Sequence, residues 1–541
     1  MTHSQHSHWL ISLALLVVGA LSALAFAPDP FPAWFLPWLQ IAGLAFLFYC
    51  LLGARHTKQA IYHSLFFGFG HFSTGLYWVF ISLHRYGGLA EPLAGGAVAL
   101  LGLGLAVYLV VFTLLARWLA PYPSDEQAAG LFYNAFVWAS AWALVEWLRG
   151  TLFTGLPWLN SAYAHVDGFL AGWAPLVGVY GLNWLIGFLA CSLALVVRAQ
   201  GTPNDRSAAF AVLCAAALFI AGWGLQHRQW SQPIGAPLLV RLTQGNIPQS
   251  EKFDPQLMQQ GLDTYMQLAN LPPKTAGAEP ELIVLPETVM VLFQDAYPGQ
   301  VWLRWQSIAK AHQASLLMGA PIKSSSKDDA DQSLHYTNSA LLVSGDTPLE
   351  RLFDGQADGR YDKHHLVPFG EFIPAGFRWF VNALNIPLGD FDRGELGQTP
   401  FTINDQLVAP NICYEDVFGE EIIAAVRSAN NPAKSATILV NISNLGWFGD
   451  SFALGQHLQI SRMRAIETAR PMLRSTNTGM TAAIDPNGAI RAVLPAHSVG
   501  VLDVEVQGTS GITPYVQWGN WPVIVWSLLF LLAALARRMR K

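Results

Sequence analysis

Long apolar stretches, separated by short polar segments, dominate the first 230 residues of the chain. A stretch of roughly 20 apolar residues is long enough to cross the hydrocarbon core of a bilayer as a helix. An eighth stretch, Trp521–Ala536, comes near the end of the chain and is followed by the basic segment RRMRK. The first seven lie near residues 9–27, 34–53, 60–83, 90–116, 129–148, 170–197 and 208–226. The pattern predicts a multi-pass bundle of eight transmembrane helices.

Between the seventh and eighth stretches the chain has the composition of a soluble protein. Short apolar runs alternate there with amphipathic segments, which is typical of a layered α/β fold rather than a β sandwich. The expected strands lie at 237–247, 281–287, 315–322, 338–344, 407–415, 436–444, 472–479 and 480–488. The expected helices are Pro255–Leu271, Trp302–His312, Phe418–Ser428 and Gln456–Ala469. We therefore expect a seven-helix bundle at 1–226, an inserted α/β domain at 227–518 and an eighth helix at 519–541.

The lysine and arginine residues of the short loops predict the orientation of the chain, because cytoplasmic loops are enriched in them. With the N-terminus inside, the outer loops hold Arg85 and Arg149. The inner loops and tail hold Arg55, Lys58, Arg117, Arg198, Arg206, Arg537, Arg538, Arg540 and Lys541. This places both termini in the cytoplasm and the α/β domain outside it. The first stretch ends in SALAFAP like a signal peptide, but it is long and no basic residue precedes it, so we expect a retained helix.

The composition agrees with a membrane protein and narrows the candidate chemistry. Hydrophobic residues make up 52% of the 541 and charged residues 12%, against about 25% charged in soluble domains. The net charge of -5 gives no reason to expect a nucleic-acid partner. Cys50, Cys191 and Cys214 lie in apolar runs, where thiols act as small hydrophobes. Cys413 is the cysteine that lies elsewhere.

Cys413 lies in NICYEDVFGEE, where an apolar run gives way to the helix-like segment FGEEIIAAVRSA. At such a junction the helix dipole and free N–H groups would stabilise a thiolate and make it nucleophilic near neutral pH. On position alone, a buried structural cysteine is the simpler interpretation.

Two other segments carry charged residues beside apolar runs. Glu287 ends ELIVLPE, where burial would raise its pKa toward that of a general base; a capping or surface acid is the alternative. Lys363 in YDKHHLVPFGE offers a fixed cation for an oxyanion, with Glu371 to hold it; a surface ion pair is the alternative. His364 and His365 have no further ligand at metal spacing, so we expect no metal site.

Taken together, these segments resemble the nitrilase superfamily. LPE at Glu287, YDKHHLVPFGE around Lys363 and NICYED around Cys413 stand in the order of that family's Glu–Lys–Cys set. The segments TQGNIPQSEKFDP, SNLGWFGDS, QHLQISRMRAIETARPMLRSTNTG and GITPYVQWGNWP, and the plan of seven helices, outer domain and eighth helix, are similar to the apolipoprotein N-acyltransferase family. The resemblance covers essentially the whole chain. It implies a nitrilase-like αββα sandwich carried on the membrane bundle.

The resemblance also implies roles for individual residues. Glu287 would be the base, Lys363 the oxyanion partner and Cys413 the nucleophile. Supporting residues would be Glu371, Tyr414 and Glu415. Candidates for substrate binding are Phe253, Trp447 and Arg149, and the resemblance itself gives no firm role to Arg149. No cofactor or metal is implied. Two positions depart from the family pattern, since Phe253 stands where tryptophan is common and Leu445 where aspartate is common.

Arg149 has a simpler interpretation as well. It lies three residues after Glu146, one helical turn away, at the outer end of the fifth stretch. Ionisable groups at membrane depth are candidates for function, but two of opposite charge at this spacing can also simply neutralise each other.

The chemistry predicted from these residues is a ping-pong acyl transfer. Cys413 attacks an ester carbonyl, Lys363 stabilises the oxyanion and Glu287 protonates the leaving alcohol, which gives a thioester; an amine then takes the acyl chain. The aromatic loops 149–170 and 377–391 would protect the thioester from water, or would simply lie in the membrane interface.

The resemblance implies the substrates and the location. The donor is a glycerophospholipid, commonly phosphatidylethanolamine, and the acceptor is the α-amine of the diacylglyceryl-cysteine of a bacterial lipoprotein. Both lie in the outer leaflet of the bacterial inner membrane, and a monomer suffices. Two alternatives remain open: a membrane-anchored nitrilase-type amidase that acts on small amides, and a non-catalytic membrane scaffold or transporter.

Overall fold

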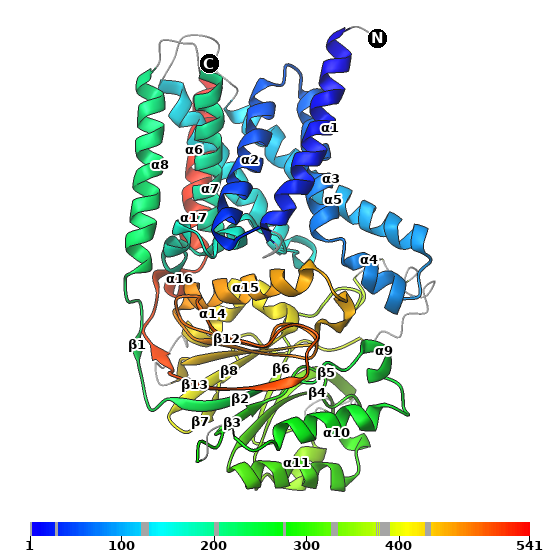
Figure 1. The fold of residues 1–541 in the computed structure, drawn as a ribbon. Coiled ribbons are helices and arrows are strands. Elements are labelled where there is room, and N and C mark those ends of the chain that lie inside the picture. Colours follow the sequence, from blue (N-terminus) through cyan, green and yellow to red (C-terminus); the bar gives the residue numbers. More distant parts are fainter. Residues whose placement is uncertain are drawn as a thin grey trace.

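The computed structural model describes residues 3–26, 31–120, 129–199, 205–273, 277–325, 334–374, 376, 378, 390–427 and 434–540. Helices gather at one end of the molecule and two sheets at the other (Figure 1). The chain passes from the bundle into the sheets after α8 and returns to the bundle in α17. Both termini therefore lie at the end of the bundle that is far from the sheets (Figure 1).

Each of the eight predicted apolar stretches overlaps a long helix of the structure. The helices are α1 (His3–Ala23), α2 (Leu36–Gly53), α3 (Thr57–Gly75), α5 (Glu91–Leu119), α6 (Ala129–Thr151), α7 (Ala174–Ala199), α8 (Asp205–Gln226) and α17 (Trp521–Met539). Among the described residues, five spans are long and apolar enough to cross a membrane: Trp9–Phe26, Ala33–Gly53, Glu91–Leu119, Phe169–Arg198 and Trp521–Met539. A multi-pass helical bundle is confirmed, while eight is an approximate count of its membrane spans.

The third predicted stretch, 60–83, is the one whose helix differs most from the prediction. The helix α3 ends at Gly75, and the chain continues as α4 (Val79–Ile81) and a π-helical turn at Ser82–Tyr86. In this turn the Ser82 hydroxyl donates a hydrogen bond to the main-chain oxygen of Trp447, 2.7 Å away in the α/β domain.

Two six-stranded sheets form the centre of the α/β domain. The first has the order β13-β2-β3-β4-β5-β6 and the second the order β12-β11-β10-β9-β8-β7. The central pairs β2/β3, β3/β4, β8/β9 and β9/β10 are parallel, and the outer pairs are antiparallel. In the first sheet the strands are β2 (Leu238–Gln244), β3 (Leu282–Val284), β4 (Ser315–Ser325), β5 (Leu334–Val343), β6 (Gly359–Asp362) and β13 (Gly500–Val506). In the second they are β7 (Phe401–Ile403), β8 (Gln406–Ile412), β9 (Ile438–Ser443), β10 (Met472–Thr476), β11 (Ala482–Ile484) and β12 (Ile490–Val493).

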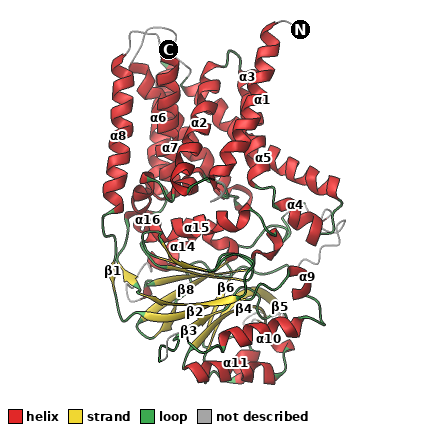
Figure 2. Ribbon diagram, viewed as in Figure 1, coloured by secondary structure: helices red, strands yellow, loops and turns green. Residues whose placement is uncertain are grey.

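Helices cover the outer face of each sheet, which gives the four layers of the predicted αββα sandwich (Figure 2). The helices α10 (Met258–Ala269) and α11 (Gly299–His312) pack on the first sheet around Trp302 and Trp305. The helices α14 (Gly419–Arg427) and α15 (Phe452–Thr468) pack on the second. A third apolar core, with Val284 and Ile442 among its members, lies between the sheets. Central strands buried on both faces explain why the sequence shows them as continuous apolar runs.

All eight predicted strands and all four predicted helices of this domain have counterparts in the structure. The sequence did not predict the seven-residue strand β13 and several shorter elements. The shorter ones are β6, β7, β12, the pair β1 (Gln232–Pro233) and β14 (Thr509–Ser510), and the helices α9 (Gln249–Lys252), α12 (Leu349–Phe353) and α16 (Pro514–Trp518). Most of these strands lie at or next to sheet edges, where partial exposure removes the apolar run that marks a buried strand. The predicted domain boundaries stay a prediction.

Specific polar contacts join the α/β domain to the bundle. They lie on the side of the domain that the second sheet forms. The helices α14 and α15 lie between the sheets and the bundle (Figure 1). The Oε1 atom of Gln456 on α15 accepts hydrogen bonds from the indoles of Trp78 and Trp158 at 3.1 and 2.8 Å. The main-chain N–H of Val179 donates to Glu467 at 2.8 Å, and Arg462 pairs with Asp167 at 2.5 Å. These contacts determine which face of the α/β domain turns toward the bundle.

Candidate active site

Glu287 lies just beyond the carboxyl end of β3, the edge of a parallel sheet where functional groups commonly gather. Its side chain is buried, and Oε1 accepts a hydrogen bond from the Asn338 amide at 2.8 Å. Oε2 accepts one from the main-chain N–H of Asn444 at 2.9 Å. Gly319 on β4 passes so close that an added Cβ would lie 2.7 Å from the Glu287 Cα. The close approach of these strands therefore requires glycine at position 319.

Lys363 directly follows β6 and connects two carboxylates. Its ammonium is 1% exposed and lies 2.9 Å from Glu371 Oε1 and 3.4 Å from Glu287 Oε1. The Asn338 amide donates to both acids, at 2.7 Å to Glu371 and 2.8 Å to Glu287. Burial alone would lower the pKa of Lys363, but the carboxylates of Glu371 and Glu287 raise it above its usual value. Lys363 is therefore a permanent cation held between two acids.

Cys413 is the first residue after β8 and has a left-handed backbone, with φ of 54°. This conformation costs a non-glycine residue roughly 1–2 kcal/mol, and surrounding contacts must maintain it. Its main-chain oxygen accepts hydrogen bonds from the Asn441 amide at 3.1 Å and from His457 Nε2 at 3.2 Å. The residue is partly exposed. The sharp turn therefore sets the direction in which the chain leaves the sheet at the thiol.

The sequence predicts that Cys413 is a thiolate near neutral pH, and the structure shows that this prediction is wrong. Burial raises the pKa of the Cys413 thiol well above its usual value, the Glu287 carboxylate raises it further, and the Lys363 ammonium lowers it only in part. The helix dipole invoked from the sequence is missing at this position, because Cys413 begins a single 3-10 turn, η8 (Cys413–Val417), and α14 starts only at Gly419. The proton therefore stays on the sulfur.

The expected rise in the pKa of Glu287 is also wrong. Burial would raise it, but the Lys363 ammonium, the Asn338 amide and the Lys252 ammonium, with the main-chain N–H of Asn444, hold the pKa below its usual value. Sequence reasoning counted burial and could not count these partners. An ionised Glu287 and a protonated Cys413 act on each other electrostatically, because the carboxylate is among the groups that raise the pKa of the thiol.

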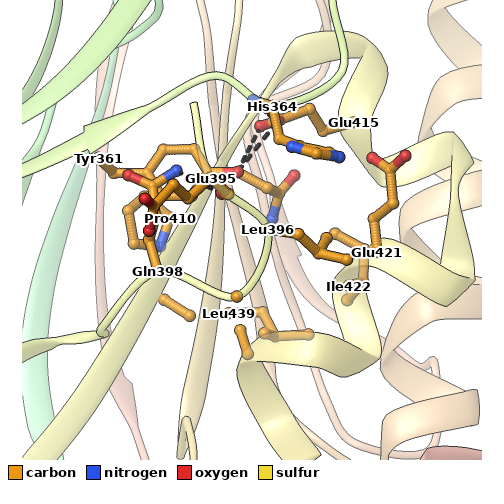
Figure 3. A pocket seen from close by; sticks show the side chains of 14 residues that line it. Tyr361, His364, Glu395, Leu396, Gln398, Pro410, Glu415, Glu421, Ile422 and Leu439 are labelled. Carbon is orange, nitrogen blue, oxygen red and sulfur yellow. Dashed lines mark hydrogen bonds between the residues drawn. The ribbon is translucent and has the colours of Figure 1, made fainter. Parts of the chain in front are cut away.

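Glu415 ties the turn at Cys413 to the segment that carries Lys363. Its oxygens accept hydrogen bonds from the Tyr361 hydroxyl at 2.9 Å and from the main-chain N–H groups of Ile412 and His364, both at 2.6 Å. Figure 3 shows Glu415 reaching Tyr361 and His364 beside a small pocket. Burial raises the pKa of Glu415 to about 7, and the donors from Ile412 and neighbouring residues oppose that rise. None of Glu287, Lys363 or Cys413 lines that pocket.

Tyr414, the residue after the thiol, contacts the bundle. Its hydroxyl donates a hydrogen bond to the main-chain oxygen of Gly155 at 3.2 Å, and its ring stacks on Trp158 with centroids 6.4 Å apart. Both partners belong to the aromatic loop 149–170, in which Trp158 is buried and Phe153 is 93% exposed. The other predicted aromatic loop, 377–391, lies almost entirely outside the described residues.

The three candidates for substrate binding fall into two environments. Phe253 and Trp447 are 49% and 41% exposed, and their rings lie 6.4 Å apart. Arg149 is 1% exposed; its Nη2 lies 3.0 Å from Glu146 Oε2 and its Nη1 donates to the main-chain oxygen of Trp158 at 2.8 Å. The ion pair of Arg149 with Glu146, which the sequence offered as the simpler interpretation, is thus present. Substrate binding by Arg149 stays a prediction. Leu445, the departure from the family pattern, is buried at the start of the turn that carries Trp447.

Several residues of the site were not singled out from the sequence. Asn338 is a polar residue inside an apolar strand run, which is a usable signal. Asn444 acts through its main chain, for which no sequence signal exists. Lys252 is 5% exposed and its Nζ donates to the main-chain oxygen of Glu287 at 3.1 Å. In the part of the chain that the structure describes, no group of three His, Cys, Asp or Glu side chains is placed to hold a metal ion.

Comparisons with known proteins cover both halves of the chain. Residues 18–192 match the family model for the apolipoprotein N-acyltransferase N-terminal domain, and residues 239–515 match the carbon-nitrogen hydrolase model. The chain is 47% identical over 536 residues to the apolipoprotein N-acyltransferase of Bordetella bronchiseptica, with 98% of each chain covered. It is 44% identical over 524 residues to that of Ralstonia nicotianae, covering 97% of this chain and 93% of the relative. Among solved structures it is similar to a mutant of the Nesterenkonia amidase from the nitrilase superfamily, at 17% identity and a TM-score of 0.35, covering 53% of this chain and 95% of the amidase.

Proposed function

The chain belongs to the apolipoprotein N-acyltransferase family, and from this premise we propose how its residues acylate lipoproteins. It is an acyltransferase of the bacterial inner membrane with phospholipid and lipoprotein substrates. We propose a Glu–Lys–Cys triad of Glu287, Lys363 and Cys413 that works by a ping-pong mechanism. The observation that supports it most strongly is the buried Glu287 carboxylate, which accepts hydrogen bonds from Asn338 and Asn444 and lies 3.4 Å from the Lys363 ammonium.

In the first step Cys413 gives its proton to Glu287 as the sulfur attacks the ester carbonyl carbon of the donor. The carbonyl oxygen becomes an oxyanion, which the Lys363 ammonium stabilises; a donor of this kind contributes about 3 kcal/mol. When the intermediate collapses, the ester C–O bond breaks and Glu287 returns the proton to the leaving alcohol of the lysophospholipid. A thioester on Cys413 and an ionised Glu287 remain.

In the second step the acceptor α-amine attacks the thioester carbonyl, and Lys363 stabilises the second oxyanion. Glu287 takes a proton from the attacking nitrogen, which becomes neutral as the amide forms. The C–S bond breaks, and the proton passes from Glu287 to the sulfur. The enzyme thereby returns to its starting protonation state, and the single carboxylate serves as base and acid in both halves.

Supporting roles follow from the contacts around the triad. Glu371 fixes the Lys363 ammonium, and Glu415 fixes the main chain on both sides of the site. Tyr414 couples the nucleophile turn to the bundle loop. Phe253 and Trp447 offer an exposed aromatic surface against which an acyl chain can pack. Arg149 remains a candidate for substrate binding. Its side chain pairs with Glu146 and holds the aromatic loop 149–170, which Tyr414 contacts.

We propose the arrangement in the membrane from the basic residues and the chain path. The bundle spans 1–226 and the catalytic domain 227–518 lies in the periplasm, with the eighth helix at 519–541 and both termini in the cytoplasm. The donor is a phospholipid such as phosphatidylethanolamine, and the acceptor is a diacylated apolipoprotein. One chain contains the whole triad, so a monomer is sufficient.

A two-stage mass measurement tests this function. Purified protein is incubated with phosphatidylethanolamine alone, and intact mass should show one added acyl chain in the wild type and in the control Cys214→Ala, and none in Cys413→Ala. Addition of a diacylated lipopeptide should then discharge the adduct and give an N-acylated peptide. A wild type that processes the lipopeptide without ever gaining the mass of an acyl chain would overturn the covalent mechanism. Discharge as free fatty acid alone would indicate a hydrolase.

A further inference from the structure

The short helix α9 (Gln249–Lys252) is connected to Glu287 in two ways, directly at its main-chain oxygen and indirectly through Asn444. Lys252 donates a hydrogen bond from Nζ to the main-chain oxygen of Glu287 at 3.1 Å. Gln249 accepts one from the Asn444 side chain at 2.8 Å, and the main-chain N–H of Asn444 donates to Glu287 Oε2. The position of Lys252 is therefore fixed relative to Glu287 by both ends of the helix.

Lys252 and its neighbour Phe253 face different surroundings. The lysine is 5% exposed, whereas Phe253 is 49% exposed and lies near Trp447. A buried ammonium is costly unless an opposite charge compensates it. A lysine that is buried while the aromatic residue beside it is exposed indicates a specific electrostatic partner inside the site.

The charged groups around Lys252 identify that partner. Burial lowers the pKa of Lys252 to about 8, and the charges of Glu287 and Cys413 oppose that decrease. On its own segment, Glu251 is exposed to solvent. The helix α10 packs on α9 and carries Asp263, which forms a surface ion pair with Arg304 at 2.7 Å. Glu287 is therefore the acid that faces the Lys252 ammonium.

The balance of charge in the buried site depends on this second lysine. Glu287 and Glu371 contribute two negative charges, and Lys363 and Lys252 contribute two positive ones. With a neutral thiol the sum is zero, and it stays zero when the Cys413 proton moves to Glu287. Without Lys252 the same groups would carry one uncompensated negative charge throughout the reaction, among side chains that are buried and where screening by water is weak.

We propose that Lys252 is a second cation of the active site, a positioning residue that keeps Glu287 ionised and stabilises the Cys413 thiolate as it forms. This inference rests on the proposed function, because it assigns Lys252 to the first half-reaction of that mechanism. No atom of the substrate needs to touch Lys252, since its charge acts through Glu287 and Cys413.

The pH dependence of acylation follows from the signs of these interactions. The Lys252 ammonium lowers the pKa of Glu287, so removing it raises that pKa and moves the acid limb of the rate profile to higher pH. In the wild type, Lys252 loses its proton as the pH rises through about 8, and the rate should then fall toward that of the uncharged variant. A variant without a titrating group at position 252 should lack this decrease.

The test measures the rate of acyl-enzyme formation from phosphatidylethanolamine in a single turnover, by intact mass, between pH 6 and pH 10. No acceptor amine is present, so its titration does not contribute. Lys252→Met removes the charge, Lys252→Arg keeps it at every pH, and Lys310→Met removes an exposed lysine as the matched control. Titration of the donor headgroup affects all variants alike.

We expect Lys252→Met to acylate about tenfold or more slowly near neutral pH, because one opposite charge shifts the pKa of an acid by about one unit or more and the Cys413 thiolate loses that stabilisation as it forms. Lys252→Arg should keep most of the rate and lose the decrease near pH 8. If Lys252→Met folds and its rate of acyl-enzyme formation and pH profile equal those of Lys310→Met, the inference is overturned. If Lys252→Met does not fold, an unchanged decrease near pH 8 in Lys252→Arg overturns it. A wild type that forms no acyl-enzyme would instead overturn the proposed function and this inference with it.

Discussion

Two buried clusters of charged side chains act on Cys413, and they do so in different ways. The first, here the catalytic cluster, consists of Glu287, Asn338, Lys363 and Glu371. The second, here the bracing cluster, consists of Asp416, His457, Ser461 and Arg474, all completely buried. The charges of the catalytic cluster act more strongly on the pKa of the thiol than Asp416 of the bracing cluster does, whereas the bracing cluster also holds the main chain of the same residue.

The hydrogen bonds of the bracing cluster explain why it cannot do acid–base work. Arg474 donates to His457 Nδ1 at 2.9 Å, so the imidazole proton lies on Nε2, which faces Asp416 Oδ1 at 2.8 Å and the Cys413 oxygen at 3.2 Å. Burial would raise the pKa of Asp416, but His457 and Arg474 hold it below its usual value.

The comparison teaches that the choice of cation decides what a buried cluster can do. Arginine keeps its charge and its planar set of donors, and it suits the strained turn that must stay fixed at Cys413. Lysine is a compact charge whose pKa moves with its surroundings, and both cations near Glu287 are lysines, Lys363 and Lys252. Variants of each cluster should therefore differ in kind as well as in size of effect.

The largest effect is expected for Glu287→Gln, which removes the base and leaves the shape of the side chain almost unchanged. Acyl-enzyme formation should slow by about a thousandfold, since a positioned base contributes 10²–10⁴ in rate. Thermal unfolding should show a folded protein, and the exposed Glu350→Gln is the matched control. Acylation within tenfold of the control would show that another group accepts the thiol proton.

The second largest effect is expected for Lys363→Met. Acylation should be slower by about two orders of magnitude, because the oxyanion loses its cation. The variant also leaves Glu287 and Glu371 close together without their shared ammonium, which destabilises the fold. In the double variant Lys363→Met with Glu371→Gln, the melting temperature should recover and the rate should not. Recovery of both would reduce Lys363 to a structural role.

A smaller effect on the rate is expected when the bracing cluster is changed. His457→Phe keeps a ring that can stack on Trp158, now 5.6 Å from the imidazole, but it removes the donor to Cys413 and leaves Asp416 short of a partner. An unsatisfied buried group costs about 1–3 kcal/mol, which lowers the melting temperature. The pH profile of acylation should keep the wild-type midpoints. If the acid-side midpoint of this pH profile shifted in His457→Phe, the distinction between the two clusters would be lost.

The smallest effect is expected at Phe253, outside both clusters. Phe253→Trp restores the residue common in the family and keeps an aromatic surface near Trp447, so kcat/KM for the phospholipid should change by about twofold or less. Phe253→Ala should raise KM more than it lowers kcat, because it removes apolar contact area and no charge. A large drop in kcat for Phe253→Trp would mean that the phenyl ring has a role in positioning α9.

The fold could be predicted from the sequence wherever burial of an element produces a continuous apolar run. The eight central strands are apolar runs, and Glu287 and Cys413 come where such runs end. The short edge strand β7 and the four-residue helix α9 carry no comparable pattern. Glu287 and Lys363 follow strands of the first sheet, whereas Cys413 follows β8 of the second sheet, 126 positions after Glu287. Only the family resemblance made this combination foreseeable.

The directions of the pKa shifts could not be predicted for a different reason. Burial of Glu287 was foreseeable from ELIVLPE, but the shift depends on Lys363, Asn338 and Lys252, which come from other elements. The same holds for Cys413, where a 3-10 turn replaces the helix start expected from FGEEIIAAVRSA. Opposing contributions of similar size decide the sign, and only the three-dimensional arrangement gives their balance.

The most direct test of this account is the pH dependence of Cys413 alkylation by iodoacetamide, followed by peptide mass in the wild type and in Glu287→Gln. We predict that the wild-type rate keeps rising beyond pH 9 without a plateau, because the resting sulfur is protonated. In Glu287→Gln the curve should move to lower pH, because a negative neighbour has been removed. A wild-type rate that is already constant below pH 7 would mean a resting thiolate and would contradict the account.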